Sequence, residues 1–268
     1  MADISQLLIF FISILGILVG SFLNALVWRM HKRIPIGGTE RSQCTYCQHQ
    51  LSWYDLVPII SWLTLKGKCR YCHKSISIQY PLVELTNAII WVFSYYLLQP
   101  DSTSGYLVLL LWLVTVSVML ALAVYDIRWM ELPDRLVIVF TSLAILIVFL
   151  QIFNTDKTSI SQVIDPILGM IFIAGLFYFL YSISNEKWIG GGDVKFAVGM
   201  GLILGLQGSI IGLFLASLIG SIFGLGTIWI LKKDKKSLIP FGPFLIAATY
   251  IVFHFETPII TWYMTNLL

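Results

Sequence analysis

Long apolar runs alternate with short polar segments along the chain. The runs cover residues 4–28, 82–99, 106–125, 136–153, 163–183, 196–206, 210–231 and 241–253. A helix crosses a bilayer with about 20 apolar residues, so this pattern predicts an all-α polytopic membrane protein with about eight transmembrane helices. The first run is too long for the apolar part of a signal peptide and has no cleavage site after it. The run at 196–206 is short and rich in glycine, which predicts a helix that is tilted, broken or packed against a neighbour by close backbone approach.

The composition agrees with a membrane protein. Hydrophobic residues make up 58% of the chain and charged residues 12%, which is less charge than a soluble surface of this size needs. The spans leave room for one small extramembrane module. We therefore divide the chain into a first transmembrane helix at 1–28, a module at 29–80 and a membrane domain at 81–268.

The positions of lysine and arginine predict the orientation. Residues 28–80 hold eight of the 17, and a run of lysines at 232–236 follows the seventh apolar run, whereas the loop at 100–105 has none. The positive-inside rule then places the N-terminus outside, in a multi-pass protein of the plasma (inner) membrane whose basic loops are cytoplasmic. The net charge of +3 follows from this topology and does not predict nucleic-acid binding.

The module at 29–80 contains two C-x-x-C pairs, Cys44 with Cys47 and Cys69 with Cys72. A cytoplasmic loop is reducing, so these cysteines are predicted to be metal ligands rather than disulfides. Four thiolates favour a tetrahedral zinc ion in a zinc-ribbon-like module. The zinc would be structural, because about 50 residues cannot build a large core. Free or redox-active thiols are the alternative.

The acidic residues near the membrane form a second group of candidates. The predicted topology places Asp126, Glu131 and Asp134 in one cytoplasmic turn and Asp193 in another. Ionisable groups at this depth are costly and are therefore functional candidates. For Glu131, Asp134 and Glu186, an ordinary loop charge that reaches water is the simpler interpretation. The residues alone nevertheless do not choose Asp126 over Asp134.

Asp193 differs from the other acids because Gly190, Gly191 and Gly192 precede it. Such a run lets another backbone, for example an extended peptide, approach closely. The sequence is also compatible with a flexible interhelical turn. Combined with Asp126, it leads to the hypothesis of two carboxylates that share a proton around a water, one acting as base and the other as acid.

A set of motifs in a fixed order extends over nearly the whole chain. They are residues 20–24, Arg29, the two C-x-x-C pairs, residues 67–70, residues 80–85, Asp126, residues 132–134, residues 190–195 and residues 240–244. With this set the chain resembles the bacterial type IV prepilin peptidases, in the larger form that also N-methylates.

This resemblance implies that Asp126 and Asp193 are the catalytic pair of a GxGD-type membrane aspartic protease. The substrates would be prepilins or pseudopilins, whose short basic leader is removed at the cytoplasmic face. The new N-terminal residue would then be methylated from S-adenosylmethionine. The chain has no G-x-G-x-x-G turn for that cofactor, and we place the methyltransferase region in the N-terminal third, with Asn24, Arg29 and Glu84.

Two other classes of function use similar features. A transporter or channel also carries intramembrane acids and broken helices, although it more often places them near the bilayer midplane. A non-enzymatic assembly subunit would use the cysteine module as a docking platform. Loss of activity in an Asp193→Asn protein that still folds would separate an enzyme from both.

Overall fold

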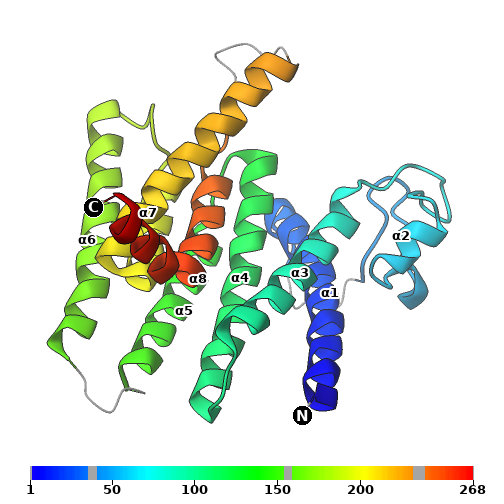
Figure 1. Cartoon of the computed structure of the whole chain (residues 1–268). Helices are drawn as coiled ribbons and strands as arrows, with labels where there is room; N and C mark the ends of the chain where they lie inside the picture. The colour runs from blue at the N-terminus through cyan, green and yellow to red at the C-terminus, as the bar shows by residue number, and fades with distance from the viewer. Residues whose placement is uncertain (1, 36–40, 154–158, 232–238, 268) are drawn as a thin grey trace. The chain divides into compact units, whose positions relative to one another are not determined.

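The computed structural model describes residues 2–35, 41–153, 159–231 and 239–267, and these residues form a helical protein (Figure 1). Apart from two isolated bridges, they contain no β-structure. Within these described ranges, seven helices are long and apolar enough to cross a membrane. The predicted all-α, multi-pass membrane fold is therefore confirmed. The lysine run at 232–236 lies outside the described residues.

The chain divides into two compact units, Met1–Gln99 and Pro100–Leu268. The first unit contains α1 (Ala2–Lys32), a 3-10 helix at Trp53–Asp55, α2 (Ile60–Thr64) and α3 (Gln79–Leu98). Its two long helices pack closely where α1 has a glycine: a Cβ atom at Gly20 would lie 2.6 Å from the Cα of Glu84 in α3. Because α3 belongs with α1, the first compact unit extends past residue 80, where the sequence placed its division.

The second unit contains the remaining helices: α4 (Thr103–Trp129), α5 (Asp134–Phe153), α6 (Ile160–Ser184), α7 (Gly191–Leu231) and α8 (Gly242–Leu267). Aromatic pairs join its helices. Trp112 of α4 is fully buried and stacks on Phe253 of α8, with 3.6 Å between ring centroids. Phe140 of α5 stacks on Phe196 of α7 at 4.6 Å. The buried rings of Trp112, Phe140 and Phe196 belong to the core of the unit.

Helix α7 is interrupted at Gly205, whose φ of 65° and ψ of −172° are not helical. The limb before the break, residues 191–204, is about 21 Å long at 1.5 Å per residue, which is less than the hydrocarbon thickness of a bilayer, about 30 Å. The sequence pattern counted the two limbs as separate spans at 196–206 and 210–231. Eight predicted runs therefore correspond to seven helices, one of which has two limbs.

The limb after the break runs antiparallel to α8. A Cβ atom at Gly208 would lie 3.3 Å from the carboxyl group of Glu256, in the second half of α8. Twelve residues further along α7, a Cβ atom at Gly220 would lie 3.2 Å from the ring of Phe244, near the start of α8. The second limb thus leads back toward the end of the unit where α8 begins.

Two acids satisfy backbone groups that the break leaves without helical partners. The N–H of Leu206 donates to Asp165 Oδ1 at 3.1 Å, and the N–H of Gly208 donates to the carboxyl group of Glu256. In hydrocarbon, an unsatisfied N–H costs several kcal/mol. Gly205 has positive φ and lies against the Asp165 carboxylate, so a side chain at this position would be excluded on both grounds.

Candidate active site and metal centre

The four cysteines of the module converge. The sulfur atoms of Cys44, Cys47, Cys69 and Cys72 all lie within 4.8 Å of one another, and those of Cys44 and Cys72 are 3.8 Å apart. A tetrahedral zinc ion with Zn–S bonds of about 2.3 Å separates its sulfur ligands by about 3.8 Å. The group therefore has the size and the donor chemistry of a metal site.

The two C-x-x-C pairs lie in turns of the same geometry. An antiparallel bridge closes each turn, between residues 43 and 50 in the first and between residues 68 and 75 in the second. Gln48 and His73, each four residues after the first cysteine of its pair, both have a φ of 57°. Two copies of one turn thus present their sulfurs to a single point. His49 is outside this sulfur group and places its ring 3.6 Å from that of Tyr71.

The thiols of this cluster differ in acidity. Burial opposes ionisation of Cys44, but hydrogen bonds from the N–H groups of Cys47 and Tyr46 and from neighbouring thiols lower its pKa to about 7. At Cys72 the N–H of Lys74 favours the thiolate. Burial and the hydrogen bonds with the other three thiols favour the protonated form and raise the pKa to about 11. A cluster in which one thiol is already acidic is suited to bind a metal cation in exchange for protons.

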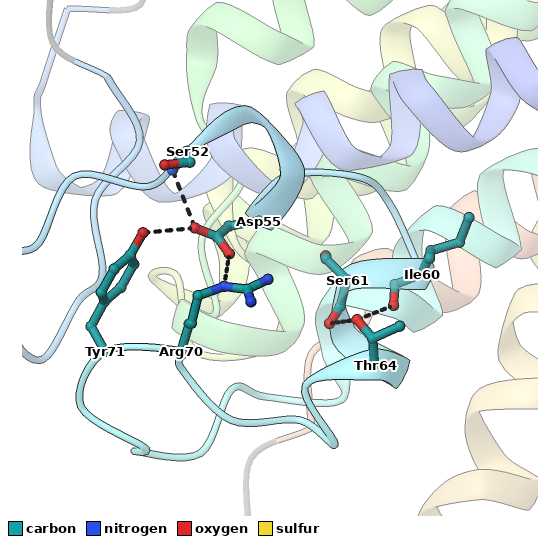
Figure 2. Close-up of polar contacts among 7 residues, drawn as sticks. All are labelled: Ser52, Asp55, Ile60, Ser61, Thr64, Arg70 and Tyr71. Carbon is teal, nitrogen blue, oxygen red and sulfur yellow. Dashed lines mark hydrogen bonds and ion pairs between the residues drawn. The ribbon is translucent and has the colours of Figure 1, made fainter.

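Asp55 joins the segment between the two turns to the second turn (Figure 2). Its Oδ1 accepts a hydrogen bond from Arg70 Nε at 2.8 Å, and its Oδ2 accepts from the Tyr71 hydroxyl and the Ser52 N–H, both at 3.2 Å. Burial raises the pKa of Asp55, but the hydrogen bonds from Arg70, Ser52 and Tyr71 outweigh it, and the net pKa lies below the usual value. The carboxylate therefore stays ionised at neutral pH and holds Arg70 beside the cysteines.

Two of the three residues predicted for the methyltransferase region lie in the contact between α1 and α3. Asn24 is 4% exposed, and its Nδ2 donates to the carbonyl oxygens of Tyr80 and Gly20. Glu84 is 5% exposed and accepts from the N–H of Ile59 at 2.7 Å. Arg29 lies in the last turn of α1. Asn24 thus joins α1 to the start of α3, and Glu84 joins α3 to the residue before α2. Of their buried side-chain polar atoms, Asn24 Oδ1 has no hydrogen-bond partner among the described residues.

Asp126 and Asp193 line one cavity. Asp126 is in the last turn of α4 and 5% exposed, and Asp193 is in the first turn of α7. The cavity has a volume of about 410 Å³ and is lined only by residues of the segments 126–134 and 190–193. The two carboxyl groups are close enough for electrostatic repulsion between them when both are ionised. Two acids from remote parts of the sequence are thus brought to one place.

Asp134 lines the same cavity but differs from Asp126 in two respects. Its side chain is 63% exposed, and its Oδ1 forms an ion pair with Lys195 Nζ at 2.6 Å. A solvated acid that already has a cationic partner is poorly suited to exchange protons with a bound water. The structure therefore separates two acids that the sequence alone did not.

Close backbone approach fixes the positions of both acids. A Cβ atom at Gly192 would lie 2.8 Å from Leu132 Cβ, so the turn before Asp193 packs directly on the loop after Asp126. A Cβ atom at Gly242, the first residue of α8, would lie 2.5 Å from Asp126 Oδ2. The N–H of Gly242 also donates to this carboxyl group. Gly242 belongs to the 240–244 motif, but its role could not be predicted from the sequence, because only the fold places it beside Asp126.

Comparison with known proteins gives two matches to family models. Residues 14–98 match the model described as the bacterial peptidase A24 N-terminal domain, and residues 113–225 match the type IV leader peptidase family. A prepilin leader peptidase/N-methyltransferase of Aeromonas hydrophila is 33% identical over 228 residues, which is 85% of this chain and 76% of the relative. The chain belongs to the type IV leader peptidase family.

Other members of the type IV leader peptidase family match over a larger share of their length. Prepilin leader peptidase/N-methyltransferases of Xanthomonas campestris pv. campestris and Bacillus subtilis (strain 168) are each 30% identical, over 275 and 258 residues. These matches cover 93% and 94% of this chain and 92% and 96% of the relatives. No solved structure matches. Membership of a peptidase family supports an enzyme and does not favour a transporter, a channel or a non-enzymatic assembly subunit.

Proposed function

We propose that this protein removes the short basic leader of type IV prepilins or pseudopilins, with Asp126 and Asp193 as its catalytic pair. The observation that carries the proposal is the cavity of about 410 Å³ that both aspartates line. The names of the family relatives, which specify prepilin leader peptidase activity, give the substrate class.

The chemistry follows from the needs of peptide hydrolysis. A water must lose a proton as it attacks the carbonyl carbon, and the leaving amine must gain one, so a base and an acid are required at the same time. Two nearby carboxyl groups that repel each other as anions hold one proton between them and can supply both. Asp126 and Asp193, which line one cavity and repel each other when both are ionised, are the proposed pair.

The turn at Gly190, Gly191 and Gly192 is proposed as the place where the substrate backbone approaches. Gly190 is exposed, and its N–H donates to the Asp193 carboxyl group. A chain segment without side chains lets an extended peptide lie against it and reach the acids at van der Waals distance. Gly192, in the same segment, packs closely on Leu132 in the loop after Asp126.

We place the active site at the cytoplasmic face of the plasma membrane, with the N-terminus outside. Arg29, His31 and Lys32 end α1 and precede the cysteine module, so the positive-inside rule favours this end of α1 as cytoplasmic. Counting spans from α1, the end of α4 and the start of α7 lie on the same side as the module. A leader that is basic and cytoplasmic would meet the pair there.

We propose zinc as the metal of the four-cysteine cluster, in a structural role. The separation of the sulfurs agrees with tetrahedral thiolate coordination, and four sulfurs leave no open position for a reactive water. Free or redox-active thiols are less favoured, because the two turns present all four sulfurs to one point. Bound zinc would join the turns of a small module that has little apolar core of its own.

N-methylation of the mature N-terminus is the second proposed activity, with S-adenosylmethionine as methyl donor, and it rests on the family relatives. When bound, that cofactor would supply an electrophilic methyl group to the new α-amine. Asn24 and Glu84 are buried in helix packing, so their polar atoms do not fit an open cofactor pocket. Arg29, at the end of α1, is the more accessible of the three predicted residues.

The peptidase proposal is tested by Asp126→Asn and Asp193→Asn. Asn keeps the shape of Asp and cannot exchange a proton, so each variant should lose several orders of magnitude of leader cleavage. The double variant should be little worse, because the pair acts as a unit. Asp134→Asn is the matched control and should retain substantial activity. Membranes with equal amounts of each variant would be assayed for leader removal on gels, and robust cleavage by either single variant would refute the pair.

Methylation requires a separate measurement. Prepilin incubated with the protein and labelled S-adenosylmethionine should become labelled at the mature N-terminus only. Asp193→Asn supplied with substrate that is already cleaved should still transfer the label, because the two activities use different compact units. Cleaved but unlabelled product, under conditions in which a bifunctional relative labels its own substrate, would leave a peptidase only.

A further inference from the structure

Helix α2 of the cysteine module presents an apolar face outward. Ile60 is 61% exposed and Leu63 is 60% exposed, and their spacing places them on one face of the helix. Thr64 is also exposed on this face, but it donates its hydroxyl to the backbone carbonyl oxygens of Ile60 and Ser61 (Figure 2). Helix α2 contains no charged residue. A face of this composition is unfavourable in water.

The opposite face of α2 is already used by the module. Trp62 donates its Nε1 hydrogen to the carbonyl oxygen of Ile76 at 3.1 Å, and a Cβ atom at Gly67 would lie 2.9 Å from its ring. Trp62 therefore belongs to the interior of the module. Ile60 and Leu63 point away from it, and their exposure is a property of the folded module rather than of a helix that lacks packing.

The position of α2 along the membrane helix α3 is fixed by a buried hydrogen bond. Glu84 is the sixth residue of α3, about 7.5 Å along the axis from its start at Gln79. Its Oε2 accepts the N–H of Ile59 at 2.7 Å, directly before α2 begins. Helix α2 therefore lies beside the second turn of a membrane span, at the depth of the headgroup and acyl boundary.

The backbone at this contact is strained, which indicates that it is held in place. Ile59 has a φ of 59° and a ψ of −54°, and the N–H of Ile60 donates to the carbonyl oxygen of Pro58 at 2.5 Å. This is a γ-turn with positive φ, which is rare for any residue and more so for a β-branched one. Such conformations persist where the surroundings over-determine them. Here the Glu84 carboxylate holds the turn by accepting the N–H of Ile59.

The charge of the same segment matches a phospholipid surface. Residues 56–83 contain three lysines, Arg70 and no aspartate or glutamate; Arg70 is paired with Asp55, which leaves the three lysines to face the lipid. Lys66 and Lys68, which follow α2, are both exposed. Trp53, on the 3-10 helix before α2, is 79% exposed. Basic side chains near the bilayer are attracted to anionic lipids, and tryptophan is enriched at membrane interfaces.

We propose that the outer face of α2, formed by Ile60, Leu63 and Thr64, inserts into the headgroup and acyl boundary of an anionic bilayer. The cysteine module is then a peripheral membrane anchor attached between two spans, rather than a domain surrounded by water. Insertion keeps the module at a fixed height on the membrane. This inference depends on α3 being a span and not on the peptidase activity.

Lipid photocrosslinking tests the proposal in the full-length protein. A benzophenone amino acid would replace Leu63 in one variant and Tyr46 in another, and each protein would be reconstituted in vesicles of phosphatidylethanolamine and phosphatidylglycerol. Tyr46 is 64% exposed in the first cysteine turn and serves as the matched control. Wild-type metal content in both variants would show that the module is folded.

We expect lipid adducts at position 63 to exceed those at position 46 by about tenfold, since only an inserted face meets acyl chains. A second variant with the probe at Ile60 should behave like the one at Leu63. Equal labelling at 46 and 63 would overturn the proposal. Crosslinks from position 63 to a second copy of the chain or to added prepilin would also overturn the proposal, because the face would then bind protein and not lipid.

Discussion

Replacing Gly242 with alanine should disable cleavage without unfolding the protein. The new Cβ atom would start 2.5 Å from Asp126 Oδ2, whereas ordinary contacts of this kind begin at 3.4 Å, so the carboxyl group or α8 must move by about 0.9 Å. A displacement of about 1 Å at reacting groups can cost about 100-fold in rate, equivalent to about 2.7 kcal/mol of transition-state stabilisation. We therefore expect a loss of about that size in kcat.

Gly175→Ala is the control for this variant. It lies in α6 of the same unit, and a Cβ atom there would meet no other atom within 4 Å among the described residues. Alanine also favours helix more than glycine does, so this variant should keep wild-type activity. Both proteins would be purified, their Tm values would be compared with that of the wild type to show that they are folded, and leader cleavage would be assayed at saturating prepilin. If Gly242→Ala cleaved as fast as Gly175→Ala, the backbone of α8 would not position Asp126.

Two further predictions concern the glycine turn and the metal. Gly192→Ala should strongly reduce cleavage, because its Cβ atom would lie 2.8 Å from Leu132 Cβ, while Gly175→Ala, whose Cβ atom would meet nothing within 4 Å among the described residues, should be tolerated; equal activity of the two variants in the same gel assay would contradict this. Purified protein should contain about one zinc per chain. A Cys44→Ser, Cys69→Ser double variant should lose the zinc and become more sensitive to protease, and unchanged zinc by elemental analysis would exclude the assignment.

The break in α7 determines which helix ends meet at the candidate active site. The limb at 191–204 is too short to cross a bilayer, and the limb after Gly205 runs back along α8. Asp193 at the start of the first limb and Gly242 at the start of α8 therefore lie at one end of the unit, where Leu132 contacts both Gly192 and Gly242. Without the reversal at Gly205, α8 would not bring its first N–H to Asp126.

Local features of the sequence determined much of this protein. The apolar runs predicted the spans because span length is set by bilayer thickness, and this needs no tertiary information. The C-x-x-C pairs predicted a cysteine cluster because thiol chemistry and a tight turn are both local. The run before Asp193 indicated close backbone approach for the same reason. The ordered motifs led to the family to which the chain belongs.

Tertiary structure decided how these features combine. Asp126 and Asp134 are equivalent in a hydropathy pattern, and burial, the hydrogen bond from the Gly242 N–H to Asp126 and the ion pair of Asp134 with Lys195 distinguish them. Glu84 was placed in the methyltransferase region by resemblance, and only the fold shows that its carboxylate accepts the N–H of Ile59, 25 residues earlier in the chain. Such contacts depend on which helices meet and how closely, and a pattern of residue types along one chain does not encode that distance.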